Sequence, residues 1–348
     1  MATSMAIESP IPVTVLTGFL GAGKTTLLNH LLRQPAMAGT AVMINEFGEI
    51  GLDHLLVEAL EEDAILLQAG CLCCTIRGDL SAALQRLAAR VETGQEVRRV
   101  VLETTGLADP VPILQTLLAD PAIQRHFTLA GVVTLVDAAN GLATLDAQPE
   151  AVRQVAVADR LLVSKPDLAD AATLDALLAR LAQINPGAVP AMAENGAAPV
   201  EALLGEGRFD PANHGEAVRG WLDASAWAQH GHHHHHHHDP NRHDASIEAF
   251  CLTFDRPLPW QGLATWLEML TATRGASVLR VKGILDLEGQ DKPVAIHGVQ
   301  HVWHSPTLLS GWPEGEPRRS RIVFILRDLP RAVVEDGLAA FVQAARAS

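Results

Sequence analysis

The chain has 348 residues, of which 48% are hydrophobic, and a formal net charge of −14 at pH 7. This length allows two domains, or one large domain with an appendage. This negative net charge argues against a general nucleic-acid binder, which would carry a stripe of basic residues. It favours a protein that attracts cations. No stretch has the pattern of a signal peptide or an apolar run of membrane-spanning length, so we expect a cytoplasmic protein with no membrane partner.

The first motif is a phosphate-binding loop at residues 18–26, which matches G-x-x-x-x-G-K-[ST]. An apolar, β-branched run at 13–17 predicts a buried strand before the loop, and 26–33 predicts a helix after it. In such a loop backbone N–H groups face phosphate oxygens, Lys24 reaches the β- and γ-phosphates, and Thr25 holds Mg²⁺. The predicted nucleotide-binding residues are Gly18, Gly21, Ala22, Gly23, Lys24, Thr25 and Thr26.

The second predicted strand, at 41–45, leads into the acidic loop N-E-F-G-E. In open α/β sheets the ligand site lies at the C-terminal ends of the strands, where this loop begins. Glu46 and Glu49 are therefore candidates for a position near the γ-phosphate, Mg²⁺ or a second metal. A solvated acidic loop without a role in the site fits the same residues.

A cysteine cluster follows the next predicted strand, at 64–68. Cys71, Cys73 and Cys74 stand within four positions, so the three thiols cannot all pair with one another. A closed structural zinc site needs a fourth ligand that the local sequence does not supply, and a Cys71–Cys74 redox pair leaves Cys73 unexplained. Buried inert thiols are a third alternative. We favour a three-thiolate site with one position open for metal exchange.

A helix predicted at 77–92 and a strand at 98–102 lead into Glu-Thr-Thr-Gly. This element resembles the h-h-h-D-x-x-G motif of P-loop GTPases. Glu103 is accordingly predicted to hold Mg²⁺ through water, and the Gly106 N–H to sense the γ-phosphate.

Further strands are predicted at 131–136 and 159–163, and the second leads into Ser-Lys-Pro-Asp. That loop resembles the guanine-reading N-K-x-D motif, with Ser164 where Asn is expected. Asp167 would accept hydrogen bonds from the guanine N1–H and exocyclic amine, a donor pattern that adenine lacks. Lys165 and Asp167 are the predicted base-binding residues.

Together the P-loop, N-E-F-G-E, G-C-L-C-C, E-T-T-G-L-A-D-P and S-K-P-D motifs resemble the CobW/YjiA family of GTPases in order and spacing. The resemblance implies a GTP-dependent metallochaperone that holds zinc at the cysteines and hands it to a client metalloprotein on GTP hydrolysis. The implied cofactors are GTP, Mg²⁺ and Zn²⁺, with Co²⁺ or Ni²⁺ as alternatives to zinc. The predicted catalytic residues are Lys24, Thr25, Glu103, Glu46 and Glu49, and a group from a second subunit of a homodimer is another candidate for orienting the attacking water.

Apolar periodicity weakens after Asn185, and 194–245 is predicted to be a flexible linker with helical hints at 200–204 and 217–227. A purification tag would resemble its histidine run, but tags stand at a terminus and this run lies between two predicted structured regions. Imidazoles are largely neutral at cellular pH and bind Zn, Ni, Co or Cu, so we predict a metal-gathering segment. The predicted ligands are His232, His233, His234, His235, His236, His237 and His238.

The C-terminal part is predicted to contain strands at 247–254, 278–287, 294–299 and 321–326, with helices at 260–273 and 330–345. It resembles the C-terminal domain of the same family. Strand alternation places His297 and His301 on one face and His304 on the other, which favours ordinary histidines over a metal site. Cys251 is expected to be a small buried hydrophobic residue.

The predicted fold class is α/β, with a P-loop domain of mostly parallel sheet flanked by helices at 1–193, the linker at 194–245 and an α+β domain at 246–348. Four functions fit these motifs. The favoured one is a GTPase that loads zinc into clients, and the second is a metal-storage protein that uses the histidine run. The third is an assembly factor for a cobalt, nickel or iron enzyme or for cobalamin synthesis, and the fourth is an ATP-using kinase or ATPase.

Overall fold

A computed structural model of the chain describes residues 10–45, 65–68, 76–194, 196–204, 247–312 and 317–347. These residues divide into two compact units, one built on a parallel sheet and the other on an antiparallel sheet. Within the described ranges, no helix has both the length and the apolar character needed to cross a membrane.

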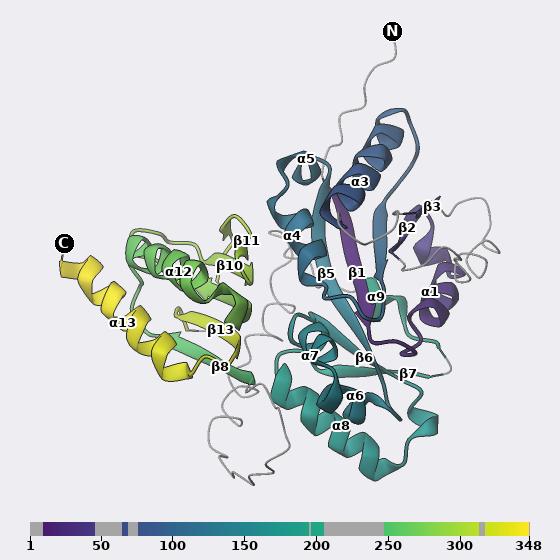
Figure 1. Ribbon diagram of the computed structural model, residues 1–348. Coiled ribbons are helices and arrows are strands. Elements are labelled where there is room, and N and C mark those ends of the chain that lie inside the picture. Colours follow the sequence, from purple (N-terminus) through teal and green to yellow (C-terminus); the bar gives the residue numbers. More distant parts are fainter. Residues whose placement is uncertain are drawn as a thin grey trace. The chain divides into compact units, whose positions relative to one another are not determined.

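The N-terminal unit is built on a seven-stranded sheet in the order β3-β2-β4-β1-β5-β6-β7, in which every neighbouring pair is parallel. Its strands are near-continuous apolar runs, as expected for a sheet covered on both faces. The strands are β1 (Ile11–Gly18), β2 (Thr40–Asn45), β3 (Ile65–Gln68), β4 (Arg99–Thr104), β5 (Phe127–Asp137), β6 (Arg160–Ser164) and β7 (Pro190–Ala193). β1 lies at the centre between β4 and β5 (Figure 1).

Helices lie on both sides of this sheet (Figure 1). α1 and α9 bury Leu27, Leu28 and Leu203 in one core with Val133 and Leu135 of β5. α7 packs on the opposite face of the sheet. Its Gln154 carbonyl accepts a hydrogen bond from Thr134 of β5, whose side chain points away from those of its neighbours Val133 and Leu135. The helices are α1 (Lys24–Leu32), η1 (Pro35–Met37), α3 (Ile76–Glu92), α4 (Val111–Ala119), α5 (Pro121–Gln124), α6 (Gly141–Ala147), α7 (Pro149–Ala156), η2 (Pro166–Leu168), α8 (Ala171–Ile184) and α9 (Val200–Leu204).

The fold class is the predicted α/β class, and the strand order explains where a ligand site can form. After β1 the chain crosses to β2 and β3, returns through β4, and then passes β1 to reach β5. This reversal of direction makes the C-terminal end of β1 a switch point, which is where open α/β sheets bind ligands.

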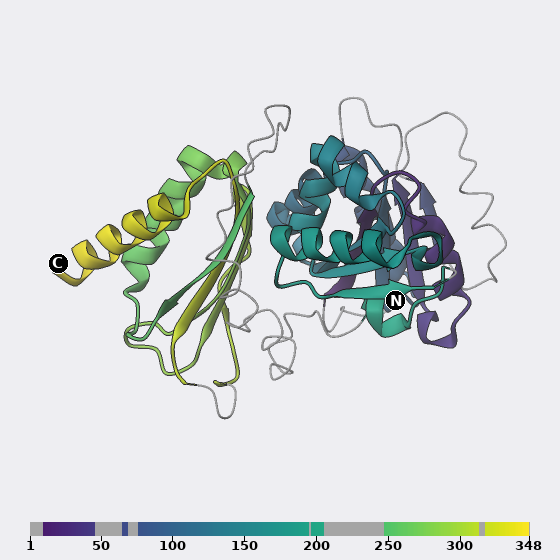
Figure 2. The same ribbon diagram turned by 90° about the horizontal axis from the view of Figure 1, so that it is seen from below.

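The C-terminal unit is an antiparallel sheet in the order β11-β10-β9-β13-β8, with β12 paired to β10. Both long helices cover one face of it (Figure 2), where Trp266 of α12 packs edge-on against Phe324 of β13. The elements are β8 (Ile247–Phe254), α12 (Trp260–Arg274), η3 (Gly275–Ser277), β9 (Val278–Leu285), β10 (Val294–Val299), β11 (Val302–Trp303), β12 (Thr307–Leu308), β13 (Ser320–Arg327) and α13 (Arg331–Ala347).

The histidines of this unit differ from the prediction. The ring of His304 stacks on that of His297, with ring centroids 4.8 Å apart, whereas the ring of His301 lies 3.1 Å from the carbonyl oxygen of Thr271 in α12. The predicted placement of His297 and His304 on opposite faces was wrong because it extended strand alternation through a turn. The chain reverses between β10 and β11, so the His304 N–H donates to the His297 carbonyl. Cys251 is partly rather than fully buried, and burial raises the pKa of its thiol.

Candidate functional site

The predicted phosphate-binding loop joins the central strand β1 to α1. Gly21 and Gly23 have φ angles of 77° and 89°, a left-handed conformation that glycine adopts readily. A Cβ on Gly18 would collide with the carbonyl oxygen of Leu135 in β5, so this position needs glycine for close packing of the loop on the sheet. The loop therefore has the tight curl that backbone binding of phosphate requires.

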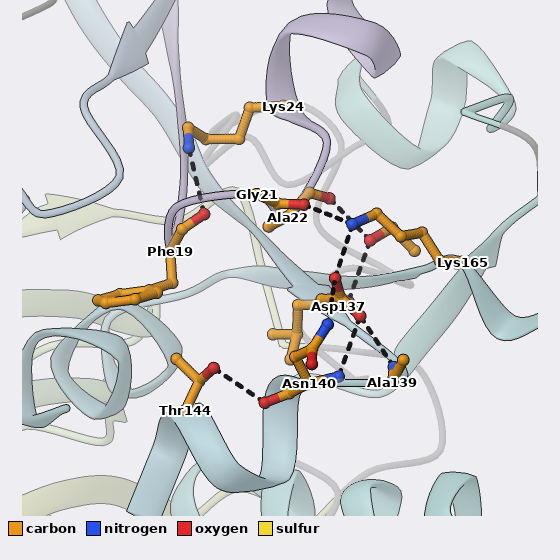
Figure 3. A network of polar contacts seen from close by, with 11 residues as sticks. Phe19, Gly21, Ala22, Lys24, Asp137, Ala139, Asn140, Thr144 and Lys165 are labelled. Carbon is orange, nitrogen blue, oxygen red and sulfur yellow. Dashed lines mark hydrogen bonds and ion pairs between the residues drawn. The ribbon is translucent and has the colours of Figure 1, made fainter. Parts of the chain in front are cut away.

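Lys24 is the first residue of α1, and its side chain is buried against the loop. Its Nζ donates to the carbonyl oxygen of Gly18 at 2.9 Å. It also donates to that of Phe19 at 3.4 Å (Figure 3). The amine is thus held over the curl of the loop, where the lysine of a P-loop meets phosphate oxygens.

Thr25, in the first turn of α1, meets Glu103 near the C-terminal end of β4. β1 pairs with β4 in a register that sets Leu16 opposite Glu103, and the Thr25 hydroxyl donates to Glu103 Oε1 at 2.9 Å. The Glu103 residue is only 4% exposed. A hydroxyl and a buried carboxylate are hard oxygen donors, the kind that Mg²⁺ prefers, so this pair fits a magnesium ion next to the phosphates.

The loop after β4 is fixed by α7, a contact that sequence reasoning missed. Gln154 is 1% exposed, and its Nε2 donates to the carbonyl oxygens of Gly106 at 3.1 Å and Ala108 at 3.0 Å. Its neighbour Arg153 forms an ion pair with Asp109 at 3.1 Å. Gly106 itself lies against the P-loop, because a Cβ there would collide with the backbone of Leu20. A buried glutamine in an amphipathic helix has no sequence motif that would reveal this role.

The predicted base-reading loop is tethered to the P-loop. Ser164, the residue that departs from the N-K-x-D pattern, donates through its buried hydroxyl to the carbonyl oxygen of Ala22 at 2.7 Å. Lys165 donates through Nζ to the carbonyl oxygen of Gly21, also at 2.7 Å (Figure 3). Asp167 follows in the short helix η2. The hydroxyl of Ser164 thus joins the two loops despite the absence of an asparagine.

Asp137, at the end of β5, is a second functional candidate absent from the sequence prediction. Its Oδ2 lies 2.7 Å from Lys165 Nζ, and its Oδ1 accepts hydrogen bonds from the backbone N–H groups of Ala139 and Asn140 (Figure 3). Burial acts to raise the pKa of Asp137, but the hydrogen bonds from Lys165, Asn140 and Ala139 outweigh it and hold the pKa below its ordinary value.

The segment after β7 also belongs to this edge. β7 pairs with β6 so that Ala193 lies beside Ser164, and a Cβ on Gly196 would come within 2.8 Å of Thr26 in α1. The prediction placed a flexible linker from residue 194 with a helical hint at 200–204. The structure has the helix α9 over those residues and packs 196–204 against the first helix. A strand of only four residues that begins with proline gives little periodicity to detect.

Several predicted site residues lie outside the described residues. They are Glu46, Glu49, Cys71, Cys73, Cys74, His232, His233, His234, His235, His236, His237 and His238. β2 and β3, which precede the acidic loop and the cysteine cluster in the sequence, end at the same edge as β1 and β4. Within the described ranges, no cluster of three or more His, Cys, Asp or Glu side chains could hold a metal.

Comparison with known proteins identifies both units. The nucleotide-binding domain model of the CobW/HypB/UreG family matches residues 12–190, and the model of the cobalamin synthesis protein cobW C-terminal domain matches residues 247–342. Zinc chaperone YjiA of Escherichia coli K12 is 32% identical, over 95% of this chain and 98% of that protein. Zinc chaperone CobW of Pseudomonas aeruginosa is 30% identical, over 96% of this chain and 92% of that protein.

The fold has a match among solved structures as well. The crystal structure of Zn(II)-bound YjiA GTPase from E. coli superimposes with a TM-score of 0.72 at 28% identity, covering 96% of this chain and 99% of that one. The resemblance expected from the motifs is therefore confirmed at the level of sequence and fold. Since the family model spans half of the chain and relatives align along nearly all of it, the chain belongs to the CobW/HypB/UreG family of nucleotide-binding proteins.

Proposed function

We propose that this chain is a Mg²⁺-dependent GTPase that binds Zn²⁺ at Cys71, Cys73 and Cys74 and transfers it to a client metalloprotein. The observation that supports the GTPase best is the pairing of Thr25 with Glu103 beside a glycine-rich loop at the switch point of the sheet. Support for zinc as cargo comes from the thiol cluster in the sequence and from relatives named zinc chaperones.

In this proposal, different described residues have different roles in GTP hydrolysis. The backbone of the P-loop and the Lys24 amine bind the phosphates, while Lys165 and Asp167 bind the guanine base. Thr25 and Glu103 would hold Mg²⁺, Glu103 through water, and the ion would supply positive charge next to the phosphates. Gly106, which Gln154 holds in place, offers its N–H to the γ-phosphate.

The remaining step is orientation of the attacking water. We propose that this role belongs to Glu46, to Glu49 or to a group from a second subunit of a homodimer. Co²⁺ or Ni²⁺ would satisfy the same thiolates as Zn²⁺, because thiolate sites tolerate several divalent metals.

The test of the proposal is GTP turnover with and without stoichiometric Zn²⁺. We expect zinc to change the turnover rate of the wild type and to leave that of the Cys71→Ser/Cys73→Ser/Cys74→Ser variant unchanged, because the proposal couples zinc binding at these thiolates to the nucleotide site. Cys251→Ser is the matched control, since this thiol lies in the C-terminal sheet and should leave the zinc response intact. An identical response of wild type and triple variant would contradict the coupling.

A second candidate function, metal storage, is favoured by the run of seven histidines alone. It predicts that deletion of residues 230–243 removes most of the bound zinc. The transfer function predicts instead that one tight zinc site survives the deletion and disappears in the triple cysteine variant. Equilibrium dialysis of both variants against buffered Zn²⁺ separates the two functions.

A further inference from the structure

The conformation of the base-reading loop depends on a strained residue. Lys165 has φ 54° and ψ 42°, the left-handed region that residues with a Cβ rarely adopt. Such a conformation costs free energy and persists only where surrounding contacts enforce it. Because Asp167 comes two residues later, the backbone at Lys165 decides where the Asp167 carboxylate points.

Two contacts of the lysine side chain enforce this conformation. Nζ lies 2.7 Å from the carbonyl oxygen of Gly21 and 2.7 Å from Asp137 Oδ2 (Figure 3). The first contact is to neutral backbone, whereas the second joins a full positive to a full negative charge. Both bonds have a charged donor, but only the second also has a charged acceptor, so Coulomb attraction adds to it and the ion pair is the stronger restraint.

The Asp137 carboxylate is also fixed by hydrogen bonds that do not involve Lys165. Its Oδ1 accepts from the backbone N–H of Ala139 at 2.8 Å and of Asn140 at 3.1 Å, and its Oδ2 accepts from Asn140 Nδ2 at 3.3 Å. These bonds tie the carboxylate to the turn that precedes α6. A pre-organised partner restrains the lysine amine at little further cost in entropy.

We propose that Asp137 is a positioning residue of the guanine site, which fixes the Lys165 amine so that the lysine stem and the Asp167 carboxylate are presented to the base. The inference rests on the proposed guanine-nucleotide function and does not require Asp137 to touch the nucleotide. Its lowered pKa keeps the carboxylate charged. The restraint is therefore complete above the ordinary value of 3.8 and is lost only as the pH falls through the lower value of the folded protein.

A double-mutant cycle tests this role. We expect Asp137→Asn to raise the Kd for GDP about 10-fold, and the same substitution in a Lys165→Gln background to change it less than about 2-fold, because the lysine that Asp137 positions is gone. At saturating GTP, kcat should stay within about 2-fold of the wild type, since Asp137 contacts none of the phosphate-binding groups. Isothermal titration calorimetry with GDP and Mg²⁺, without zinc, measures the binding.

Asp170→Asn is the matched control. It makes the same chemical change five residues after Lys165, at an exposed carboxylate that accepts a hydrogen bond from the backbone of Thr173. Its Kd for GDP should equal that of the wild type. If Asp137→Asn fails to fold, as judged by circular dichroism, Asp137→Glu keeps the charge and displaces it by one methylene, and we expect it to weaken GDP binding as well.

Three results would overturn the inference. An equal loss of affinity in both backgrounds would mean that Asp137 only supports the turn before α6, and an unchanged Kd in Asp137→Asn or Asp137→Glu would mean that it positions nothing. A fall in kcat with unchanged KM would place its effect at the phosphates. Failure of the wild type to bind GDP would instead contradict the proposed function, so the two failures are distinguishable.

Discussion

Glu103 is the residue that we propose serves both the nucleotide and the metal. The carboxylate is nearly fully buried and accepts a hydrogen bond from the Thr25 hydroxyl. The substitution Glu103→Gln keeps the shape of this side chain but removes its charge. We expect turnover to fall about 10- to 100-fold, because an outer-shell partner of a metal ion typically contributes that much to metal affinity or activity. GTP turnover measured against Mg²⁺ concentration should show a weaker apparent affinity for the metal.

The control for this prediction is Glu92→Gln, at the exposed end of α3. It makes the same chemical change at a residue that lies beside His126, just before the N-terminal end of β5 and so at the edge of the sheet opposite the site, and should leave turnover unchanged. Equal Mg²⁺ dependence of Glu103→Gln and wild type would show that the carboxylate does not serve the metal.

Residues that belong to a local pattern were predictable, and residues that act across the sheet were not. Short motifs marked Lys24, Thr25 and Glu103 as candidates from the sequence, and their side chains lie at one edge of the sheet. Asp137 is likewise at the end of a strand, but no motif marks it. Its importance appears only when β5 and β6 pair and bring it opposite Ser164.

At the scale of elements, α7 braces the loop after β4, which we propose faces the γ-phosphate. Its Gln154 donates to two carbonyl oxygens of that loop, and its Arg153 pairs with Asp109. The helix packs on the sheet at Thr134, whose hydroxyl donates to the Gln154 carbonyl. The helix is therefore tied at once to the sheet and to the loop.

Gln154→Leu should separate hydrolysis from binding. The substitution retains the size of the side chain but removes the donor to Gly106, so we expect kcat to fall about 10- to 100-fold, since small displacements at a reacting centre cost this much. The Kd for GDP should stay unchanged, because GDP lacks the γ-phosphate that the Gly106 N–H would meet. Single-turnover GTP hydrolysis and GDP titration measure the two quantities.

Gln124→Leu provides the comparison for Gln154→Leu. Gln124 in α5 likewise donates through its amide to a backbone carbonyl, that of Leu118, but in a helix pair away from the P-loop. Its kcat should match that of the wild type. If Gln154→Leu weakened GDP binding as strongly as it slowed hydrolysis, α7 would be a general support of the fold rather than a brace for this loop.

The elements themselves were predictable to the extent that they were apolar and periodic. The long strands β8 and β10 begin and end where the sequence predicted. β7 was missed because four residues beginning with proline carry too little pattern, and its pairing with β6 provides the stability that its own sequence lacks. The stacking of His297 on His304 likewise depends on a turn whose geometry strand alternation does not describe.

At the scale of the whole molecule, the distribution of tryptophan allows the two units to be observed separately. All six tryptophans lie at or after Trp221, and the chain contains no tyrosine. The P-loop unit is therefore invisible to fluorescence excited at 295 nm, while Trp266, in the core between α12 and the antiparallel sheet, reports on the C-terminal unit. Far-ultraviolet circular dichroism detects both.

Each unit has its own sheet and its own hydrophobic core, so we expect them to unfold in separate transitions. GDP with Mg²⁺ at 100 times its Kd stabilises the unit that binds it by about 2.7 kcal/mol. For a unit of this size that raises its Tm by roughly 5–11 °C. The transition seen only by circular dichroism should move by this amount, while the tryptophan transition should stay where it is. A tryptophan transition that moved equally would mean that the two units unfold as one, and that nucleotide binding stabilises the C-terminal sheet as well.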